Sequence, residues 1–392
     1  MKALIVAHES EFIGGANRAL FALLGYWKEN DLLEYEVLLP SEKGECIQEL
    51  KSLGIKYHVA KYYKVFSELQ HQPSDLLRKV KVRAEEMYNK KSAKKFSKTI
   101  EDAGFQLIYS NTRMTSMGAC IAKELGIPHV IHIREFGNDN TFWGGVTINW
   151  IYENSAHIIT ISKSLNSYLI KGLSEDKFSV SYDGVSYKHS VDFDRPENKK
   201  KGKVDILLTG RITPAKAQDE AIRAVKELKD RGYKEFKLHF AGSISKDSKY
   251  EKEYLEYLQQ LIKEYDLSSE VVFHGEVSNM QSLREKMDIE LMCAIRETFG
   301  WVTVEGMRSG LLVIGGNTGA TLEIIKDNKT GLLYRQGDAN DLADKILWAI
   351  NHPVDVLKIR KSAYSYSNHH FTVDENANDV LTVFKRVLEC DF

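Results

Sequence analysis

Two glutamates at a fixed spacing carry the clearest chemical signal in this sequence. Glu297 and Glu305 lie eight positions apart in the segment RETFGWVTVEGMRSG, after an apolar run at 289–293 that predicts a buried strand. We expect Glu297 on a loop and Glu305 more than one turn inside a helix that begins near Trp301. Backbone N–H groups at a helix start favour an anion such as a diphosphate, with the carboxylates reaching opposite ends of the ligand. Alone, the two glutamates would be read as ordinary surface acids.

A pair of cations follows another predicted strand. In the segment LLTGRITPAKAQDEAI the strand ends at Gly210, and Arg211 and Lys216 lie in a turn that contains Pro214. A helix is expected from near Gln218. Two cations at the end of a strand can hold a diphosphate, the guanidinium as a bidentate fork and the ammonium as a compact charge. On its own, this segment would be read as a solvated turn.

The elements that position these side chains form two alternating series of strands and helices, which predict two parallel, doubly wound α/β domains. The first series has apolar runs at 3–7, 35–39, 106–110, 129–133 and 157–161. The second has them at 205–210, 236–242, 271–275, 289–293 and 311–316. Open parallel sheets bind ligands beyond the carboxyl ends of their strands, so two facing domains predict one cleft.

A polar segment at 187–203 contains Pro196 and predicts a linker between the two series. We therefore expect an N-terminal domain over 1–190 and a C-terminal domain over 203–370. A last helix over 371–392 could pack on either domain, and packing on the N-terminal domain is the arrangement we predict.

Composition excludes several classes of protein. A chain of 392 residues is longer than a single hydrophobic core usually supports, so at least two domains are expected. Its net charge of -1 excludes a strongly basic nucleic-acid-binding protein. No apolar run is long enough to span a membrane, and the first residues lack the features of a signal peptide, so a cytoplasmic location is expected. Cys46, Cys120, Cys293 and Cys390 have no paired spacing, which indicates neither a disulfide framework nor a zinc site.

In combination and in this order, the motifs resemble the retaining, GT-B-fold glycosyltransferases of family 4, also called group 1 glycosyltransferases. The C-terminal half carries G-R-x-x-P-x-K at 210–216, the two glutamates as E-x7-E, and then SGLLVIGGNTGATLEII and NKTGLLY. The N-terminal half adds FIGGANRAL, YSNT at 109–112, and ITISKSLNSYLI followed by SYDGV. The resemblance covers nearly the whole chain, and the combination is more specific than any of its parts.

The resemblance implies a role for each matching residue. Arg211 and Lys216 would contact the diphosphate of a nucleotide-sugar donor, Glu297 the hydroxyls of the transferred sugar, and Glu305 the ribose. Backbone groups near the base, the phosphates and the first helix would add donor contacts. These are Gly14, Gly15, Gly210, Gly275, Val277, Thr298, Phe299, Gly300, Trp301 and Val302. For Gly14 and Gly15, a simple turn between strand and helix is an equal alternative.

Two positions depart from the family pattern. Ala217 stands where the family usually has glycine, and Arg134 stands where it usually has histidine. His132 lies two residues earlier, on the same side of a predicted strand. Either His132 or Arg134 could reach the sugar, and His132 could equally be a buried, hydrogen-bonded core residue.

The implied activity is retaining transfer of a hexose-type sugar from a nucleotide diphosphate, with a UDP-sugar favoured, to a hydroxyl of a carbohydrate or lipid-linked glycan. This transfer would be a step in the synthesis of a cell-surface polysaccharide or glycolipid. Neither a metal nor a cofactor is expected, since the D-x-D string at Asp192 to Asp194 falls in the linker. The alternatives are a GT-B sugar-nucleotide epimerase and a non-catalytic nucleotide-sugar-binding protein. A dehydrogenase is disfavoured because G-x-G-x-x-G is missing after both first strands.

A basic run at 78–98 carries nine cations against two acids. A helix of this type can lie on anionic lipid at the inner face of a membrane, which would make the protein peripheral there. A solvated helix face is the alternative.

Overall fold

The computed structural model describes residues 1–11, 14–69, 74–137, 141–187, 189–193, 203–245 and 248–389. The chain forms two compact units, Met1–Gly184 with Thr372–Phe392 and Val185–Phe371. The chain therefore leaves the first unit just before the segment predicted as a linker, most of which lies outside the described residues, and returns to it at Thr372.

The described part of the first unit is built on a seven-stranded parallel sheet in the order β3-β2-β1-β5-β6-β8-β9. Its strands are β1 (Lys2–Val6), β2 (Glu34–Leu39), β3 (Tyr57–Val59), β5 (Leu107–Ser110), β6 (His129–Ile133), β8 (His157–Thr160) and β9 (Phe178–Val180). A separate antiparallel pair joins β4 (Ser67–Glu68) to β7 (Thr141–Phe142). The inner strand β1, between β2 and β5, is buried on both faces, which explains its unbroken apolar sequence.

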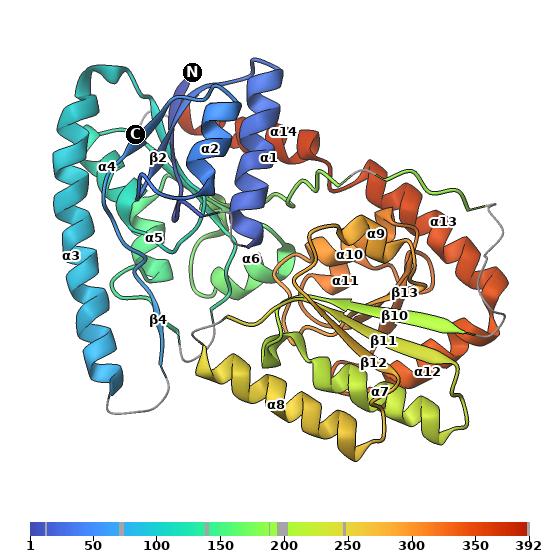
Figure 1. The fold of residues 1–392 in the computed structure, drawn as a ribbon. Coiled ribbons are helices and arrows are strands. Elements are labelled where there is room, and N and C mark those ends of the chain that lie inside the picture. The colour runs from blue at the N-terminus through green and yellow to red at the C-terminus, as the bar shows by residue number, and fades with distance from the viewer. Residues whose placement is uncertain are drawn as a thin grey trace. The chain divides into compact units, whose positions relative to one another are not determined.

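Helices cover this sheet, and one of them comes from the end of the chain. They are α1 (Gly15–Glu29), α2 (Glu45–Ser52), α3 (Ser74–Ile100), α4 (Met117–Leu125), α5 (Ile148–Asn154), α6 (Lys163–Leu169) and α14 (Val373–Glu389), with 3-10 turns at Glu101–Ala103 and Glu175–Lys177. Figure 1 shows α14 beside α1. The buried Trp27 of α1 joins them, because its ring lies 5.9 Å from that of Phe384 and its Nε1 donates a hydrogen bond to the Ala377 carbonyl.

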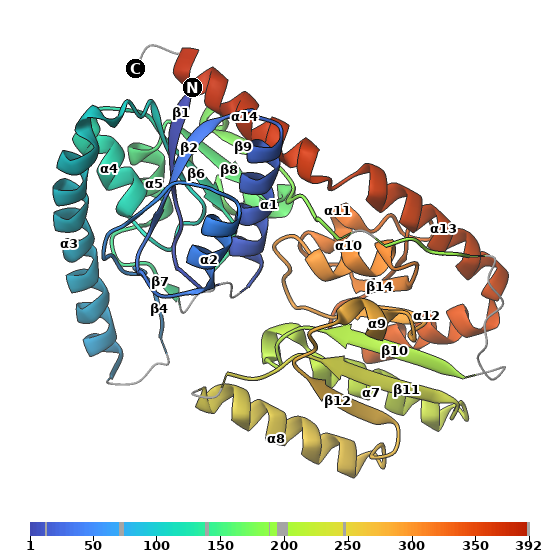
Figure 2. The ribbon, with the colours of Figure 1, turned by 45° about the horizontal axis from the view of Figure 1, so that its top comes forward.

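The longest helix, α3, runs along the outside of the first unit and packs on α4 (Figure 2). Val82, Ala93, Phe96 and Ile100 form its buried face. These apolar positions follow helical spacing, so one side of α3 joins the core and the other stays in solvent.

The described part of the second unit contains a six-stranded parallel sheet in the order β12-β11-β10-β13-β14-β15. Its strands are β10 (Val204–Thr209), β11 (Phe236–Ala241), β12 (Val271–Gly275), β13 (Ile289–Met292), β14 (Leu312–Gly316) and β15 (Leu332–Tyr334). Its helices are α7 (Gln218–Asp230), α8 (Lys249–Glu264), α9 (Met280–Arg284), α10 (Trp301–Arg308), α11 (Thr321–Ile324), α12 (Ala339–Asn351) and α13 (Pro353–His369), with a 3-10 turn at Pro214–Lys216. In this order β10 and β13 are neighbours, so the segments after them lie together at the carboxyl edge.

Candidate functional site

The carboxyl ends of β10 and β13 bring Lys216 and Glu297 into direct contact. The Lys216 Nζ donates a hydrogen bond to the Glu297 Oε2 at 2.7 Å, although 81 positions separate the residues in sequence. The two segments are also joined through the backbone, since the Ile295 N–H donates to the Ala215 carbonyl at 3.0 Å. Two of the four charged residues predicted for the donor site therefore form one ion pair at the edge of the sheet.

Backbone geometry explains the sequence of the cation turn. Gly210 has φ +149°, and a Cβ built there would lie 3.6 Å from the aliphatic carbons of Lys216, so that side chain lies over the glycine. Gly242 approaches the same strand end, because its own Cβ would be 1.9 Å from the Gly210 carbonyl oxygen. Only glycine permits that approach. Ala217 ends the turn in the left-handed conformation, with φ 50° and ψ 49°.

Arg211 lies apart from the Lys216 pair. Its Nη1 is 3.6 Å from the Glu251 Oε1 of α8, and its side chain is 55% exposed. The guanidinium is half exposed and beyond hydrogen-bond distance of Glu251, whose other oxygen accepts a hydrogen bond from the Ser245 N–H, so the pair presents a small barrier to a change of partner. Glu251 was not predicted as part of the site, and no motif marks it.

The loop before α10 presents backbone groups more than side chains. Gly300, with φ 111°, precedes the helix as its N-cap. The Phe299 side chain is 1% exposed and its ring lies 5.6 Å from that of Phe371, so only its backbone could reach a ligand. The Thr298 N–H donates to the Glu297 Oε1 at 3.2 Å, and Trp301 and Val302 are partly exposed at the helix start.

The segment after β14 braces this loop. The Ala320 N–H donates to the Glu297 carbonyl at 3.0 Å, and the Thr318 hydroxyl donates to the Ile295 carbonyl at 3.1 Å. A Cβ at Gly319 would lie 2.6 Å from the Glu297 carbonyl oxygen, so this glycine is required for the two loops to pack. The sequence contained this signal in the motif GGNTGA, but its spacing did not reveal which loop it contacts.

Glu305 is a buried member of an ionic cluster. It is 5% exposed, and its Oε2 lies 2.9 Å from the Nη1 of Arg284, which is 1% exposed and also binds Glu290. The alternative that Glu305 is a surface acid is therefore wrong. Arg284 and Glu290 were not predicted, because no motif connects an arginine on α9 with a carboxylate on β13.

Val277, one of the two residues predicted near the base, lines a shallow pocket of about 450 Å³ at the end of β12, and Gly275 is next to two of the lining residues. The Gly275 carbonyl accepts a hydrogen bond from the Gly242 N–H at 2.8 Å, which joins the ends of β11 and β12. The residues that line the pocket are His274, Glu276, Val277, Ser278, Asn279, Ser282, Leu283 and Lys286. Val277 is therefore partly exposed at this pocket, while it also packs against a small apolar cluster.

In the first unit, Gly14 is the N-cap of α1 with φ 83° and Gly15 begins the helix. A Cβ on Gly14 would meet nothing within 4 Å. The glycine is therefore needed for its backbone conformation rather than for space within this unit.

His132 and Arg134 are both buried in the first unit. The Tyr109 hydroxyl lies 2.8 Å from the His132 Nδ1, and the Arg134 guanidinium pairs with Asp183 and donates to the Asn111 carbonyl at 3.2 Å. Burial and then the charge of Arg134 hold the pKa of His132 well below its usual value, so the imidazole is neutral. The structure thus places both residues in a polar core network beneath the carboxyl ends of β5 and β6.

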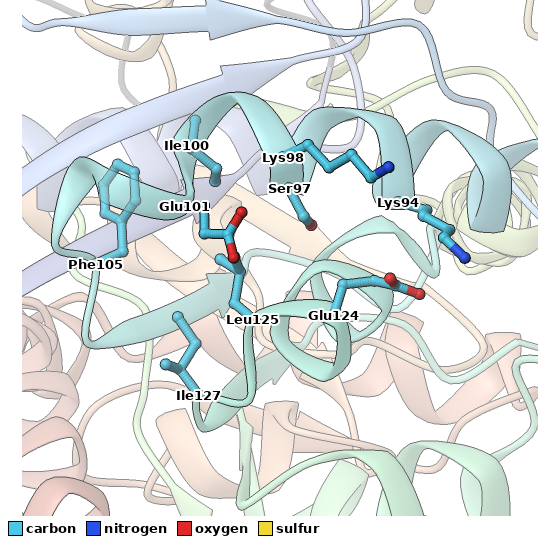
Figure 3. A pocket seen from close by; sticks show the side chains of 9 residues that line it. All are labelled: Lys94, Ser97, Lys98, Ile100, Glu101, Phe105, Glu124, Leu125 and Ile127. Atoms are coloured by element: carbon cyan, nitrogen blue, oxygen red, sulfur yellow. The ribbon is translucent and has the colours of Figure 1, made fainter.

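A second pocket, of about 320 Å³, lies between α3 and α4 (Figure 3). Its lining residues are Lys94, Ser97, Lys98, Ile100, Glu101, Phe105, Glu124, Leu125 and Ile127. Phe105 and Ile127 immediately precede β5 and β6, so this pocket is at the amino edge of the sheet. It therefore lies away from the edge where parallel sheets bind their ligands.

Three further predictions concern metals and membranes. Within the described ranges, no group of three or more His, Cys, Asp or Glu side chains is arranged to hold a metal ion. Of the D-x-D string, Asp192 is described and Asp194 lies outside the described residues. Among the helices that the structure describes, none combines the length and the apolar character needed to cross a bilayer.

Sequence comparisons relate this chain to glycosyltransferases. Residues 190–369 match the family described as Glycosyl transferases group 1. The chain is 26% identical over 313 residues to an uncharacterized glycosyltransferase of Methanocaldococcus jannaschii, covering 73% of this chain and 76% of the relative. It is 26% identical over 205 residues to the capsular polysaccharide biosynthesis glycosyltransferase CapM of Staphylococcus aureus, covering 50% of this chain and 52% of the relative.

Solved structures share the fold. Anabaena HepE in complex with UDP superposes with a TM-score of 0.78 at 21% identity, covering 98% of this chain and 100% of that chain. Sucrose-phosphate synthase of Thermosynechococcus elongatus superposes with a TM-score of 0.74 at 17% identity, covering 98% of each chain. The predicted GT-B architecture of two Rossmann-like domains is therefore confirmed.

Proposed function

We propose that this chain, a glycosyltransferase whose residues 190–369 belong to the glycosyl transferases group 1 family, moves a hexose from a nucleotide diphosphate to an acceptor hydroxyl. The observation that carries this proposal is the contact of Lys216 with Glu297 beside the start of α10. In this pair Lys216 is a cation that can bind phosphate, and Glu297 is a carboxylate that can accept hydrogen bonds from sugar hydroxyls. Both stand at the carboxyl edge of a parallel sheet, where such folds bind nucleotides.

In the proposed complex, the diphosphate lies against the amino-terminal turn of α10, with Lys216 on one side. Arg211 leaves its weak pair with Glu251 and adds a second cation. Glu297 accepts hydrogen bonds from the sugar, Glu305 faces the ribose, and the base lies near Gly275 and Val277. A UDP-sugar is the donor we favour, because the similar HepE structure contains UDP.

The proposed chemistry is electrostatic. The bond between the anomeric carbon and the β-phosphate oxygen breaks, and negative charge collects on the leaving diphosphate. Lys216, Arg211 and the α10 amides stabilise that charge, and loss of one preorganised donor of this kind raises a barrier by about 3 to 4 kcal/mol. The acceptor hydroxyl attacks from the leaving-group side and its proton passes to the diphosphate, so the anomeric configuration is retained without a metal ion. Inversion in the NMR spectrum of the product would contradict retention.

We further propose a carbohydrate or lipid-linked glycan acceptor in polysaccharide or glycolipid synthesis, at the cytoplasmic face of a membrane. The similarity to CapM supports the pathway class. The exposed face of α3 supports the location: Leu76 and Leu77 are 70% and 73% exposed, and Val80 and Met87 also face solvent. At 100° per residue these side chains fall within an arc of about 100°. Further along α3, the same arc of the helix carries Lys91, Lys94, Lys95 and Lys98.

The donor site is tested by thermal unfolding with nucleoside diphosphates and nucleotide sugars. A ligand at 100 times its Kd stabilises the native state by about 2.7 kcal/mol, so a UDP-type ligand should raise Tm. Lys216→Ala and Arg211→Ala should abolish the rise. Lys249→Ala, which removes a highly exposed lysine elsewhere in the second unit, should leave it unchanged.

Two outcomes would contradict the proposal. The absence of any shift with all nucleotides would exclude a donor site. Binding without transfer to any acceptor, or conversion of the donor to its epimer, would favour the non-catalytic protein or the epimerase. Incubation with labelled donor and candidate acceptors, followed by product analysis, distinguishes these from a glycosyltransferase.

A further inference from the structure

A buried guanidinium stands behind Glu305. The Arg284 Nε and Nη2 donate to the two oxygens of Glu290 at 2.9 and 3.1 Å, and its Nη1 lies 2.9 Å from the Glu305 Oε2. All three side chains are at least nine-tenths buried. The proposed reaction assigns no role to Arg284 or Glu290.

Glu290 fixes the direction in which Arg284 points. Its carboxylate engages one edge of the guanidinium with both oxygens, and its Oε1 accepts a further hydrogen bond from the Thr209 hydroxyl at 2.7 Å. A Cβ at Gly306 would lie 2.6 Å from the Glu290 Oε2, so α10 approaches β13 closely next to Glu305. A bidentate pair of this kind restricts the guanidinium to one plane and leaves its remaining nitrogen aimed at Glu305.

The charges of the cluster also favour a cation between Glu290 and Glu305. Burial opposes the charged forms of Arg284 and Glu290. The neighbouring carboxylates outweigh it for Arg284 and raise the pKa of its guanidinium, whereas for Glu290 burial outweighs the cation and raises the pKa of the carboxyl group. The cation therefore stays charged next to two carboxyl groups. Without it, Glu290 and Glu305 would be two buried carboxyl groups side by side that had lost the cation they share.

We propose that Arg284 is a positioning residue that orients the Glu305 side chain toward the ribose hydroxyls of the nucleotide. This inference rests on the proposed function, because it takes the ribose contact of Glu305 from there. Arg284 does not touch the nucleotide itself. Its effect should therefore be seen in the recognition of the ribose hydroxyls and not in the binding of the diphosphate.

The test compares the Kd of UDP with that of 2′,3′-dideoxy-UDP by calorimetry. A hydrogen bond to a charged group corresponds to a factor of about ten or more, so the wild-type protein should prefer UDP by at least that factor. Arg284→Met and Arg284→Lys should reduce the preference to near one by weakening UDP alone. Glu305→Gln should also reduce the preference, since a neutral amide oxygen is a weaker acceptor.

Two further variants separate positioning from stability. Arg284→Met with Glu290→Leu leaves one buried carboxyl group where the single variant leaves two, so it should be more stable than the single variant, and it should still lose the preference. Arg308→Lys alters a different buried arginine, on α10, whose hydrogen bonds go to backbone carbonyls; lysine keeps the positive charge that Arg308 places near Glu305, so this variant should keep the preference.

Each remaining outcome overturns a different statement. A folded Arg284 variant with the wild-type preference would overturn the positioning role. A wild-type protein that binds UDP and its dideoxy analogue equally would overturn this inference while the donor site stands. A wild-type protein that binds neither would overturn the proposed function and this inference with it.

Discussion

Ala217 occupies a backbone conformation that its side chain disfavours. With φ 50° and ψ 49° it is left-handed, and the Cβ of an L-residue costs about 1 to 2 kcal/mol there. Ala217→Gly should therefore cost the second unit less stability than glycine does at an unstrained position, because relief of this strain offsets the greater entropy of unfolded glycine and the loss of a buried methyl group. Denaturant unfolding measures this. Ala215→Gly, inside the 3-10 turn, is the matched control and should destabilise more; an equal loss of stability in the two variants would show that Ala217 is not strained.

The same residue shows what the sequence predicts and what it leaves open. Comparison with the family marked Ala217 as a departure, but only the structure shows why glycine is usual there. Lys216 and Glu297 were predicted to act together, and the adjacency of β10 and β13 places them 2.7 Å apart. Arg284 could not be predicted, because its partners come from a strand and another helix and the sequence does not state which polar side chains turn inward.

At the scale of elements, the long strands were predictable because unbroken apolar runs are typical of buried parallel strands. β3, β9 and β15 were missed because each spans three residues, too few for a pattern. In α3 the cationic run was visible in the sequence. The exposure of its apolar residues Leu76, Leu77, Val80 and Met87 was not visible, because apolar residues of a helix normally pack in the core. Only the contacts with α4 show that a different face of α3 is the buried one.

The exposed face of α3 leads to a prediction about membranes. Vesicles containing phosphatidylglycerol should bind the protein, and pure phosphatidylcholine vesicles should not. At about 1 kcal/mol per cation near the surface, replacing Lys90, Lys91, Lys94 and Lys95 by glutamine should remove most of the binding. Co-sedimentation at low and physiological salt measures it.

The apolar half of that face has its own control. Leu76→Ser combined with Leu77→Ser should weaken vesicle binding at low and at physiological salt alike. The double variant loses apolar side chains that insert into the bilayer and keeps its charge, so the loss should not depend on salt. Val354→Ser alters an equally exposed apolar residue of α13 in the second unit and should have no effect. Unchanged binding by the four-lysine variant would show that α3 is simply a solvated helix.

At the scale of the whole molecule, the two units differ in how the chain builds them. The second is continuous over Val185–Phe371, whereas the first needs both ends of the chain. α14 contributes Ala377, Val380, Phe384 and other residues to the core around Trp27. Removing one large aromatic side chain from such a core costs about 3 to 5 kcal/mol, and α14 supplies several apolar groups at once.

Expression of the units separately should therefore give unequal results. Residues 185–371 should fold alone, with a cooperative thermal transition, and should bind UDP with the same dependence on Lys216 as the whole chain. Every proposed contact to the diphosphate, the ribose and the base, except those of Gly14 and Gly15, lies within them. Residues 1–184 should remain unfolded or aggregate, because the surface around Trp27 that α14 covers would be open. Addition of a peptide covering 372–392 should restore structure, seen as a blue shift in tryptophan fluorescence. A stable, folded 1–184 would show that α14 is an accessory to the first unit and not part of its core.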